Sequence, residues 1–122
     1  MKQLWNDWTN LWNGDLSLAE RIIADRLTVH SHAAAPVGDP DSVTDRHGLV
    51  EWIGQVRASL GPDLTYHTSV GPFLDDGHLS CRWLATFTGE DGAQLTKGGI
   101  DVLRLEGDLI TEVWTVTGTR LL

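Results

Sequence analysis

The last quarter of the chain alternates apolar and polar residues around a short polar turn. Two apolar runs, 93–105 and 109–117, flank the turn sequence Glu-Gly-Asp. This pattern predicts an antiparallel β-hairpin. Because strand side chains repeat every two residues, Asp101 in the first run shares a face with Leu103 and Leu105. A carboxylate on an apolar face is paired, neutralised or functional, so Asp101 is the first candidate for a functional site.

The start of the chain has the spacing of amphipathic helices. Trp5, Trp8 and Trp12 repeat at intervals of three and four, which predicts a helix over residues 2–13 that ends at Asn13-Gly14. Asp15 is expected to cap a second helix that runs to about Arg26. The apolar face of this second helix would consist of Leu18, Ile22 and Ile23.

The middle of the chain predicts one short strand, one loop and one longer helix. Residues 27–32 have a strand-like pattern, and residues 33–43 contain the prolines, glycine and aspartates of a loop. An apolar stripe predicts a third helix over about 46–60, with Thr44 or Asp45 as its cap.

The remainder of the chain is predicted to be β-structure. Strands are expected over 64–70 and 78–88, followed by the two strands of the terminal hairpin. Helices at the start and a strand meander at the end indicate an α+β fold. We expect a curved antiparallel sheet with the three N-terminal helices on its concave side and a pocket between the two layers.

Composition limits the classes of protein that remain. The 122 residues favour a single domain, 1–122, and 41% apolar residues are enough for a proper core. A formal net charge of −8 argues against a nucleic-acid or anionic-membrane partner. One cysteine, no signal-like start and no long apolar stretch lead us to expect a soluble cytoplasmic protein without a membrane span.

Six tryptophans are unusual in so short a chain. Large aromatic side chains supply core area, and they also line ligand cavities. The candidates for the wall of a pocket for a small apolar or aromatic ligand are Trp12, Trp52, Trp83 and Trp114, although each could also be plain core packing. Successive strand residues point to opposite faces of a sheet, so Trp114 and Thr115 lie on different faces. If Thr115 faces the pocket, Trp114 faces away and is available for a dimer contact.

Several short segments resemble a known family. They are Asn13-Gly14-Asp15, Gly61-Pro62-Asp63-Leu64, Cys81-Arg82-Trp83 and the block 100–114, which is the most specific of the four. In this order they resemble the SnoaL-like polyketide cyclases of the NTF2-like superfamily, over nearly the whole chain. The resemblance implies an NTF2-like cone, a hydrophobic pocket and a homodimer formed through the convex face of the sheet. It implies no cofactor.

The resemblance also indicates where a site would lie. In SnoaL-like cyclases, a polar residue on the penultimate strand and an aspartate after the last-strand tryptophan move a proton during an aldol ring closure. These positions correspond to Asp101 and Thr115 here, so the acid/base aspartate of the family is replaced by threonine. A threonine hydroxyl is too weak a base for that role. Asp101 could act alone, with a pKa raised by burial, or it could be a structural carboxylate paired with an arginine or an indole N–H.

Other polar residues receive weaker assignments. His30 and His32 alternate on one strand and share a face, so either could line the mouth of the pocket. A metal site built on this pair is not expected, because no third ligand has suitable spacing. Arg82 could reach Glu112 in an ion pair on the outer face of the sheet.

Three functions from different classes are compatible with these sequence features. The first is a cyclase or isomerase that uses Asp101 as general base on an apolar carbonyl substrate, in a pocket lined by Trp12, His30, His32, Trp52, Trp83, Leu103 and Thr115. The second is a non-catalytic small-ligand-binding protein that keeps the pocket. The third is an epoxide hydrolase-like enzyme, which would require an arginine and a second carboxylate near Asp101.

Overall fold

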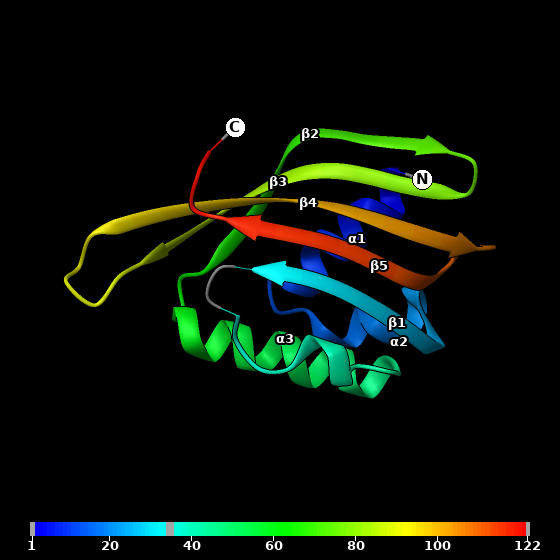
Figure 1. Ribbon diagram of the computed structural model, residues 1–122, viewed down its shortest axis with the longest axis horizontal. Coiled ribbons are helices and arrows are strands. Elements are labelled where there is room, and N and C mark those ends of the chain that lie inside the picture. Colours follow the sequence, from blue (N-terminus) through cyan, green and yellow to red (C-terminus); the bar gives the residue numbers. More distant parts are fainter. Residues whose placement is uncertain (1, 34–35, 122) are drawn as a thin grey trace.

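A computed structural model describes residues 2–33 and 36–121 of the chain (Figure 1). The helices are α1 (Lys2–Trp12), α2 (Ala19–Ile22) and α3 (Arg46–Leu60), with single 3₁₀ turns at Leu16–Leu18 and Pro40–Ser42. The strands are β1 (Ile23–Ala33), β2 (Thr65–Asp75), β3 (His78–Thr88), β4 (Gln94–Glu106) and β5 (Leu109–Gly118). None of the helices in these ranges is long and apolar enough to span a membrane.

The five strands form one sheet in the order β1-β5-β4-β3-β2. Strands β2 to β5 are an antiparallel meander, as predicted, whereas β1 joins β5 in parallel. The sheet is therefore mixed, and the expectation of a purely antiparallel sheet is wrong. The pairing of β1 with β5 joins segments from opposite ends of the chain, so no local hydrophobic pattern could specify its direction.

The helices pack against one face of the sheet, where they enclose the core (Figure 1). Helix α1 buries the indoles of Trp5 and Trp8, and α3 buries the side chains of Leu49 and Ile53. Helices α1 and α2 precede the sheet, but α3 lies between β1 and β2 in the chain. The predicted α+β arrangement is thus present, but the third helix follows the first strand along the chain, so the helices do not all precede the sheet.

The end of α1 is fastened to the sheet by one side chain. The Asn13 amide donates to the backbone carbonyl of Tyr66 at 3.0 Å, and its oxygen accepts the backbone N–H of the same residue at 2.7 Å. An asparagine amide can serve as donor and acceptor at once, so it takes the place of a strand neighbour on the free edge of β2. This contact holds the C-terminal end of α1 over β2.

The predicted second helix is much shorter than expected. The helical segment ends at Ile22, and the chain continues as β1 from Ile23, through the predicted helix end at Arg26. Asp15 does not cap this segment, because its carboxylate accepts a bond from the Ser17 hydroxyl at 2.7 Å instead. Leu18 and Ile22 are helical, as predicted, but Ile23 is the buried first residue of β1. It pairs with Ile110, which is distant in sequence, and this pairing prevails over the local helical pattern.

The third helix agrees with its prediction in both bounds and cap. It spans Arg46–Leu60, and the Asp45 carboxylate accepts the backbone N–H of Gly48 at 2.8 Å. This bond satisfies one of the free N–H groups of the first turn.

The two aspartates offer a matched test of capping. Asp45→Ala should lower the free energy of unfolding by about 1 kcal/mol, because it removes the bond to the first turn of α3. Asp15→Ala should change it by less than about 0.5 kcal/mol, since this exposed side chain caps nothing. Urea denaturation followed by circular dichroism measures both, and equal losses would contradict the assignment.

Candidate functional site

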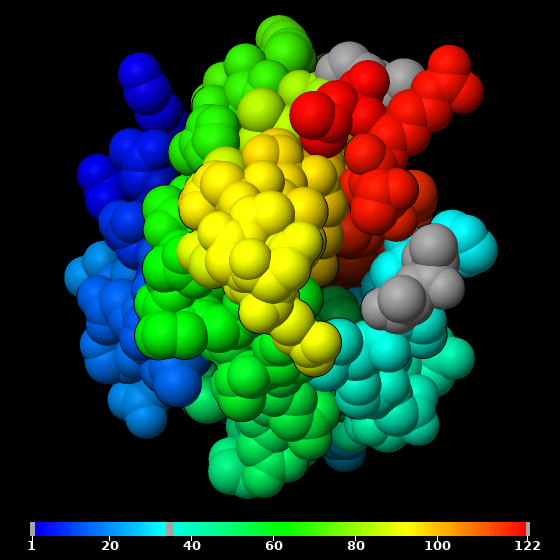
Figure 2. Space-filling view, turned by 90° about the vertical axis from the view of Figure 1, so that its left-hand side faces the viewer, coloured from blue at the N-terminus to red at the C-terminus, as the bar shows by residue number. Residues whose placement is uncertain are grey.

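A pocket lies between the helices and the inner face of the sheet. Its wall is largely aromatic and includes Trp5, Trp8, Trp12, Trp52, Tyr66 and Trp83. About 80 Å³ is open to the centres of water-sized molecules, which is several times the space that one water needs, about 15 Å³. The surface is hollowed between the β3–β4 hairpin, the end of β5 and the cyan segment after β1 (Figure 2).

The aromatic rings of the wall contact one another edge to face. The ring of Trp12 lies 5.2 Å from that of Trp52 and 5.6 Å from that of Tyr66, between centroids. Tyr66 in turn lies 5.2 Å from Trp83. Such contacts fix the orientation of each ring, so the wall presents a defined apolar surface to a ligand.

Asp101 is the only carboxylate among the described residues that line the pocket. Its side chain projects from β4, and the residue is 6% exposed. One carboxylate oxygen accepts the indole N–H of Trp8 at 3.0 Å, and the other accepts that of Trp83 at 2.9 Å. A buried carboxylate needs such donors, and here they come from α1 and β3. No arginine pairs with Asp101 in the described part of the chain.

The surroundings of Asp101 destabilise its charged form relative to that of a solvated aspartate. Burial raises the pKa of Asp101 above its usual value, and the Thr115 hydroxyl and the two indole donors act in the opposite direction. Burial prevails because water is replaced by aromatic rings on most sides. A carboxylate with a raised pKa is a stronger base than a solvated one, so this group is suited to accept a proton from carbon.

Gly99 makes room for one of the two indoles. It pairs with Trp83 across β3 and β4. A Cβ atom at Gly99 would overlap the Trp83 ring and would lie 2.6 Å from the Val116 carbonyl oxygen. The indole therefore lies across the bare backbone of β4, from where its N–H reaches Asp101.

Thr115 lies directly opposite Asp101 across β4 and β5, and it lines the pocket. Ser31 faces Thr115 from β1 and belongs to the same wall. The inner face of these central strands thus places two hydroxyl groups near one carboxylate. Neither hydroxyl is a base at neutral pH, but each can donate to an oxygen of a ligand.

Tyr66 and Lys97 also line the pocket, although neither was predicted from the sequence as a site residue. Burial raises the pKa of the Tyr66 phenol, and the charge of Asp101 adds to this effect, so the phenol stays protonated. Burial also lowers the pKa of Lys97, whose side chain lies on the same wall. Strand alternation could have indicated Lys97, because it shares the inner face of β4 with Asp101.

The predicted pocket residues fall into three groups. Trp12, Trp52, Trp83 and Thr115 lie on the wall together with Asp101. Leu103 is on the same face of β4 but is fully enclosed in the core. The third group consists of the two histidines of β1.

His30 and His32 do not belong to the pocket, and their assignment is corrected. Strand β1 directs Ser31 and Ala33 into the pocket, so His30 and His32 take the opposite face. The alternation of Leu27 and Val29, both buried, already contained this information. Among the described residues, no group of three or more possible ligands is arranged to hold a metal ion.

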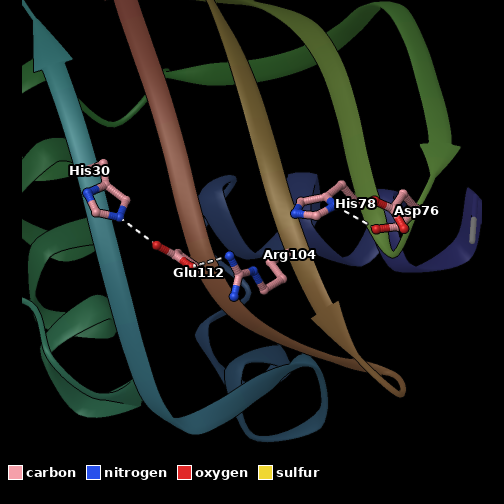
Figure 3. A network of polar contacts seen from close by, with 5 residues as sticks. All are labelled: His30, Asp76, His78, Arg104 and Glu112. Carbon is pink, nitrogen blue, oxygen red and sulfur yellow. Dashed lines mark hydrogen bonds and ion pairs between the residues drawn. The ribbon is translucent and has the colours of Figure 1, made fainter.

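The outer face of the sheet carries a separate polar network (Figure 3). Glu112 binds His30 at 2.7 Å and Arg104 at 3.2 Å. Trp114 points outward, with its ring stacked on that of His30 at 5.3 Å and the Arg104 guanidinium 5.7 Å from its centroid. The predicted pair of Arg82 with Glu112 is wrong, since Arg82 donates to the Ser69 hydroxyl at 2.8 Å.

Comparison with known proteins gives matches by structure alone. A comparison with protein-family models and with curated proteins finds no match. A protein of Acidithiobacillus ferrooxidans described as a "putative polyketide cyclase" superposes with a TM-score of 0.80 and 24% identity, over 95% of this chain and 86% of that one. IdmH of Streptomyces antibioticus, described in the same words, gives 0.78 and 21%, over 95% and 90%.

A third structure supplies the name of the architecture. It is an NTF2-like protein of unknown function from Exiguobacterium, with a TM-score of 0.66 and 16% identity, over 93% of this chain and 97% of that one. The chain has an NTF2-like fold. The likeness extends over nearly all of the chain, and at these identities it establishes the architecture, whereas the chemistry must be argued from the site.

The NTF2-like pocket of this chain should depend on Gly99. Gly99→Ala should lower the free energy of unfolding by about 1–3 kcal/mol, because the added methyl group displaces the Trp83 ring. The indole N–H signal of Trp83 in a ¹H–¹⁵N NMR spectrum should shift as its bond to Asp101 is lost. Gly118→Ala is the matched control, since a Cβ there meets nothing within 4 Å. If Gly99→Ala behaves like Gly118→Ala, this role of Gly99 is excluded.

Proposed function

We propose that this protein is a small-molecule enzyme of the cyclase or isomerase type, with Asp101 as its general base and an apolar carbonyl compound as substrate. The observation that carries the proposal is a lone buried carboxylate in the wall of an aromatic pocket, held by two indole N–H groups. Proton abstraction beside a carbonyl requires a base of raised pKa in a water-poor site, and Asp101 has both properties.

The reaction can be written with the groups in the pocket. The Asp101 carboxylate takes a proton from the carbon next to a substrate carbonyl, and the electrons of that C–H bond form an enolate. In an isomerase, Asp101 exchanges this proton with water and then delivers a proton to another carbon of the same molecule. In a cyclase, the enolate carbon attacks a second carbonyl group, and the proton goes to the alkoxide that forms. Atoms and electrons balance in both cases without a co-reactant.

The enolate oxygen needs a hydrogen-bond donor, and Tyr66 is the candidate. Its ring lines the pocket, and its phenol remains protonated because burial and the nearby Asp101 raise its pKa. A neutral phenol can donate to a developing oxyanion without adding a charge to the apolar site. The Thr115 hydroxyl, opposite Asp101, is a second possible donor.

The comparisons give independent support at a coarser level. Two of the similar structures are described as putative polyketide cyclases. Their likeness supports a pocket that accepts small molecules. The acid/base chemistry assigned to Asp101 rests on the geometry of this chain.

The two other functions are less well supported by the site. An epoxide hydrolase of the kind considered above needs an arginine and a second carboxylate, and the described lining residues supply neither. A non-catalytic binding protein remains the principal alternative, favoured by the threonine at position 115. The enzyme and the binding protein differ in a measurable property, because only the enzyme transfers protons between substrate and solvent.

Proton exchange tests the proposal without knowledge of the natural substrate. The protein should accelerate exchange of the protons next to the carbonyl of aryl ketones in D₂O, followed by ¹H NMR. Because burial raises the pKa of Asp101, the rate should rise with pH through a midpoint above 3.8. Asp101→Asn should lower the rate by about 10²–10⁴-fold, and Tyr66→Phe by about 10²-fold or more.

Asp7→Asn is the matched control, because Asp7 is the other buried acid in the described part of the chain and lies outside the pocket lining. Its carboxylate binds Gln3 and Arg21, so the variant will be less stable but should retain exchange activity. Ketone binding without accelerated exchange would contradict the enzyme and favour the binding protein.

We further propose that two copies of the chain pair through the outer face of the sheet. Ile100 and Val116 are paired across β4 and β5 on this face, where they are 51% and 57% exposed. Paired apolar side chains in the middle of a sheet face are typical of an interface. Farther along the same strands, Glu112 and Arg104 offer both signs of charge to a second copy.

Sedimentation measures this pairing directly. The wild type should sediment as a dimer, and Val116→Lys should sediment as a monomer because it places a charge in the apolar centre. Leu109→Lys, at the exposed β4–β5 turn, should leave the dimer intact. A wild type that is monomeric at all accessible concentrations would refute the pairing.

A further inference from the structure

Lys97 is a cation on the wall of an otherwise apolar pocket. It lies on β4 four residues before Asp101, and both side chains are on the inner face of the sheet. Among the described residues that line the pocket, Lys97 is the one cation and Asp101 the one carboxylate. The pocket therefore carries one charge of each sign.

Lys97 and Asp101 do not form an ion pair with each other. Four residues of an extended strand separate their Cα atoms by about 13 Å. The ammonium of Lys97 forms no ion pair with any described residue, and burial alone accounts for its lowered pKa. Asp101 instead uses both oxygens to accept indole N–H groups. A half-buried ammonium without a counter-charge is poorly solvated and is available to an external anion.

The position of Lys97 relative to the pocket mouth fits this role. Lys97 is the fourth residue of β4, close to the β3–β4 hairpin, which borders the hollow in Figure 2. Across the pocket, the segment after β1 contributes Val37 and Pro40, which are apolar. A ligand that enters here meets the ammonium near the surface and the carboxylate farther inside.

We infer that the pocket binds an elongated apolar ligand with a carboxylate at one end, and that this carboxylate pairs with Lys97. The apolar part of the ligand then lies against Trp12 and Trp52, and its far end reaches Asp101. Asp101 enforces this orientation, because its negative charge repels a carboxylate placed in the reversed sense. With the function proposed above, on which this step rests, the substrate class becomes an apolar keto acid whose carbonyl end lies at Asp101.

Binding of matched ligand pairs tests the inference without any catalysis. The probes are a short series of phenylalkanoates and the corresponding uncharged amides, titrated while tryptophan fluorescence is followed. The wild type should bind a carboxylate at least about tenfold more tightly than its amide, the difference expected for a charge-assisted hydrogen bond. Lys97→Met should abolish this preference and leave amide binding nearly unchanged.

Two variants separate the local effect from overall charge. Lys97→Arg should retain the preference, because it keeps the positive charge. Lys2→Met removes the same charge from the exposed start of α1, and it should bind like the wild type. Equal binding of carboxylates and amides by the wild type, or equal losses in Lys97→Met and Lys2→Met, would overturn the inference.

The inference and the proposed enzyme can fail separately. Asp101→Asn should bind the carboxylates at least as tightly as the wild type, since it removes a negative charge from the pocket. If the protein prefers carboxylates but does not exchange the protons of an aryl keto acid, the ligand class is supported and the enzyme is rejected. If the protein exchanges the protons of neutral aryl ketones but does not prefer carboxylates, the enzyme is supported and the ligand class is rejected.

Discussion

The hydrogen bonds from Trp8 and Trp83 to Asp101 are the interaction on which the rest of the structure depends. They join α1, β3 and β4 at one buried carboxylate, whose two oxygens are each occupied by one donor. Loss of either indole would leave part of this carboxylate unsatisfied in an apolar environment, which costs more free energy than one ordinary hydrogen bond contributes. Asp101 therefore links the position of α1 to the shape of the pocket. The bonds of Trp5 to Thr68 and of Asn13 to Tyr66 also hold α1 on the sheet.

The same constraint creates the chemical character of the site. Indole donors satisfy the carboxylate without bringing a positive charge, so burial outweighs them and the pKa of Asp101 is raised. An arginine in their place would have lowered the pKa and produced a structural ion pair. The bare backbone of Gly99 completes the arrangement, because it lets the Trp83 ring approach from the neighbouring strand. Structural support and basicity are thus two results of one set of contacts.

Sequence patterns predicted the features that depend on local periodicity. Helical spacing identified α1 and α3, and strand alternation put Thr115 and Trp114 on opposite faces of β5. The structure decides which face is which: Thr115 lines the pocket and Trp114 stacks on His30 outside it. The features that depend on distant pairing were not predicted: the parallel β1–β5 contact, and the early start of β1 at Ile23 in place of a longer helix. The error at His30 has a different origin, because the buried Leu27 and Val29 could have shown which face of β1 points inward.

The central claim is that Asp101 is a base of raised pKa held by two indoles. A ¹H–¹⁵N NMR titration of the indole N–H signals of Trp8 and Trp83 tests it most directly, with Asp101→Asn to assign the response. We expect both signals to shift together, with one midpoint above the usual 3.8 of an aspartate. Signals that shift at or below 3.8, or that respond independently of Asp101, would contradict the account.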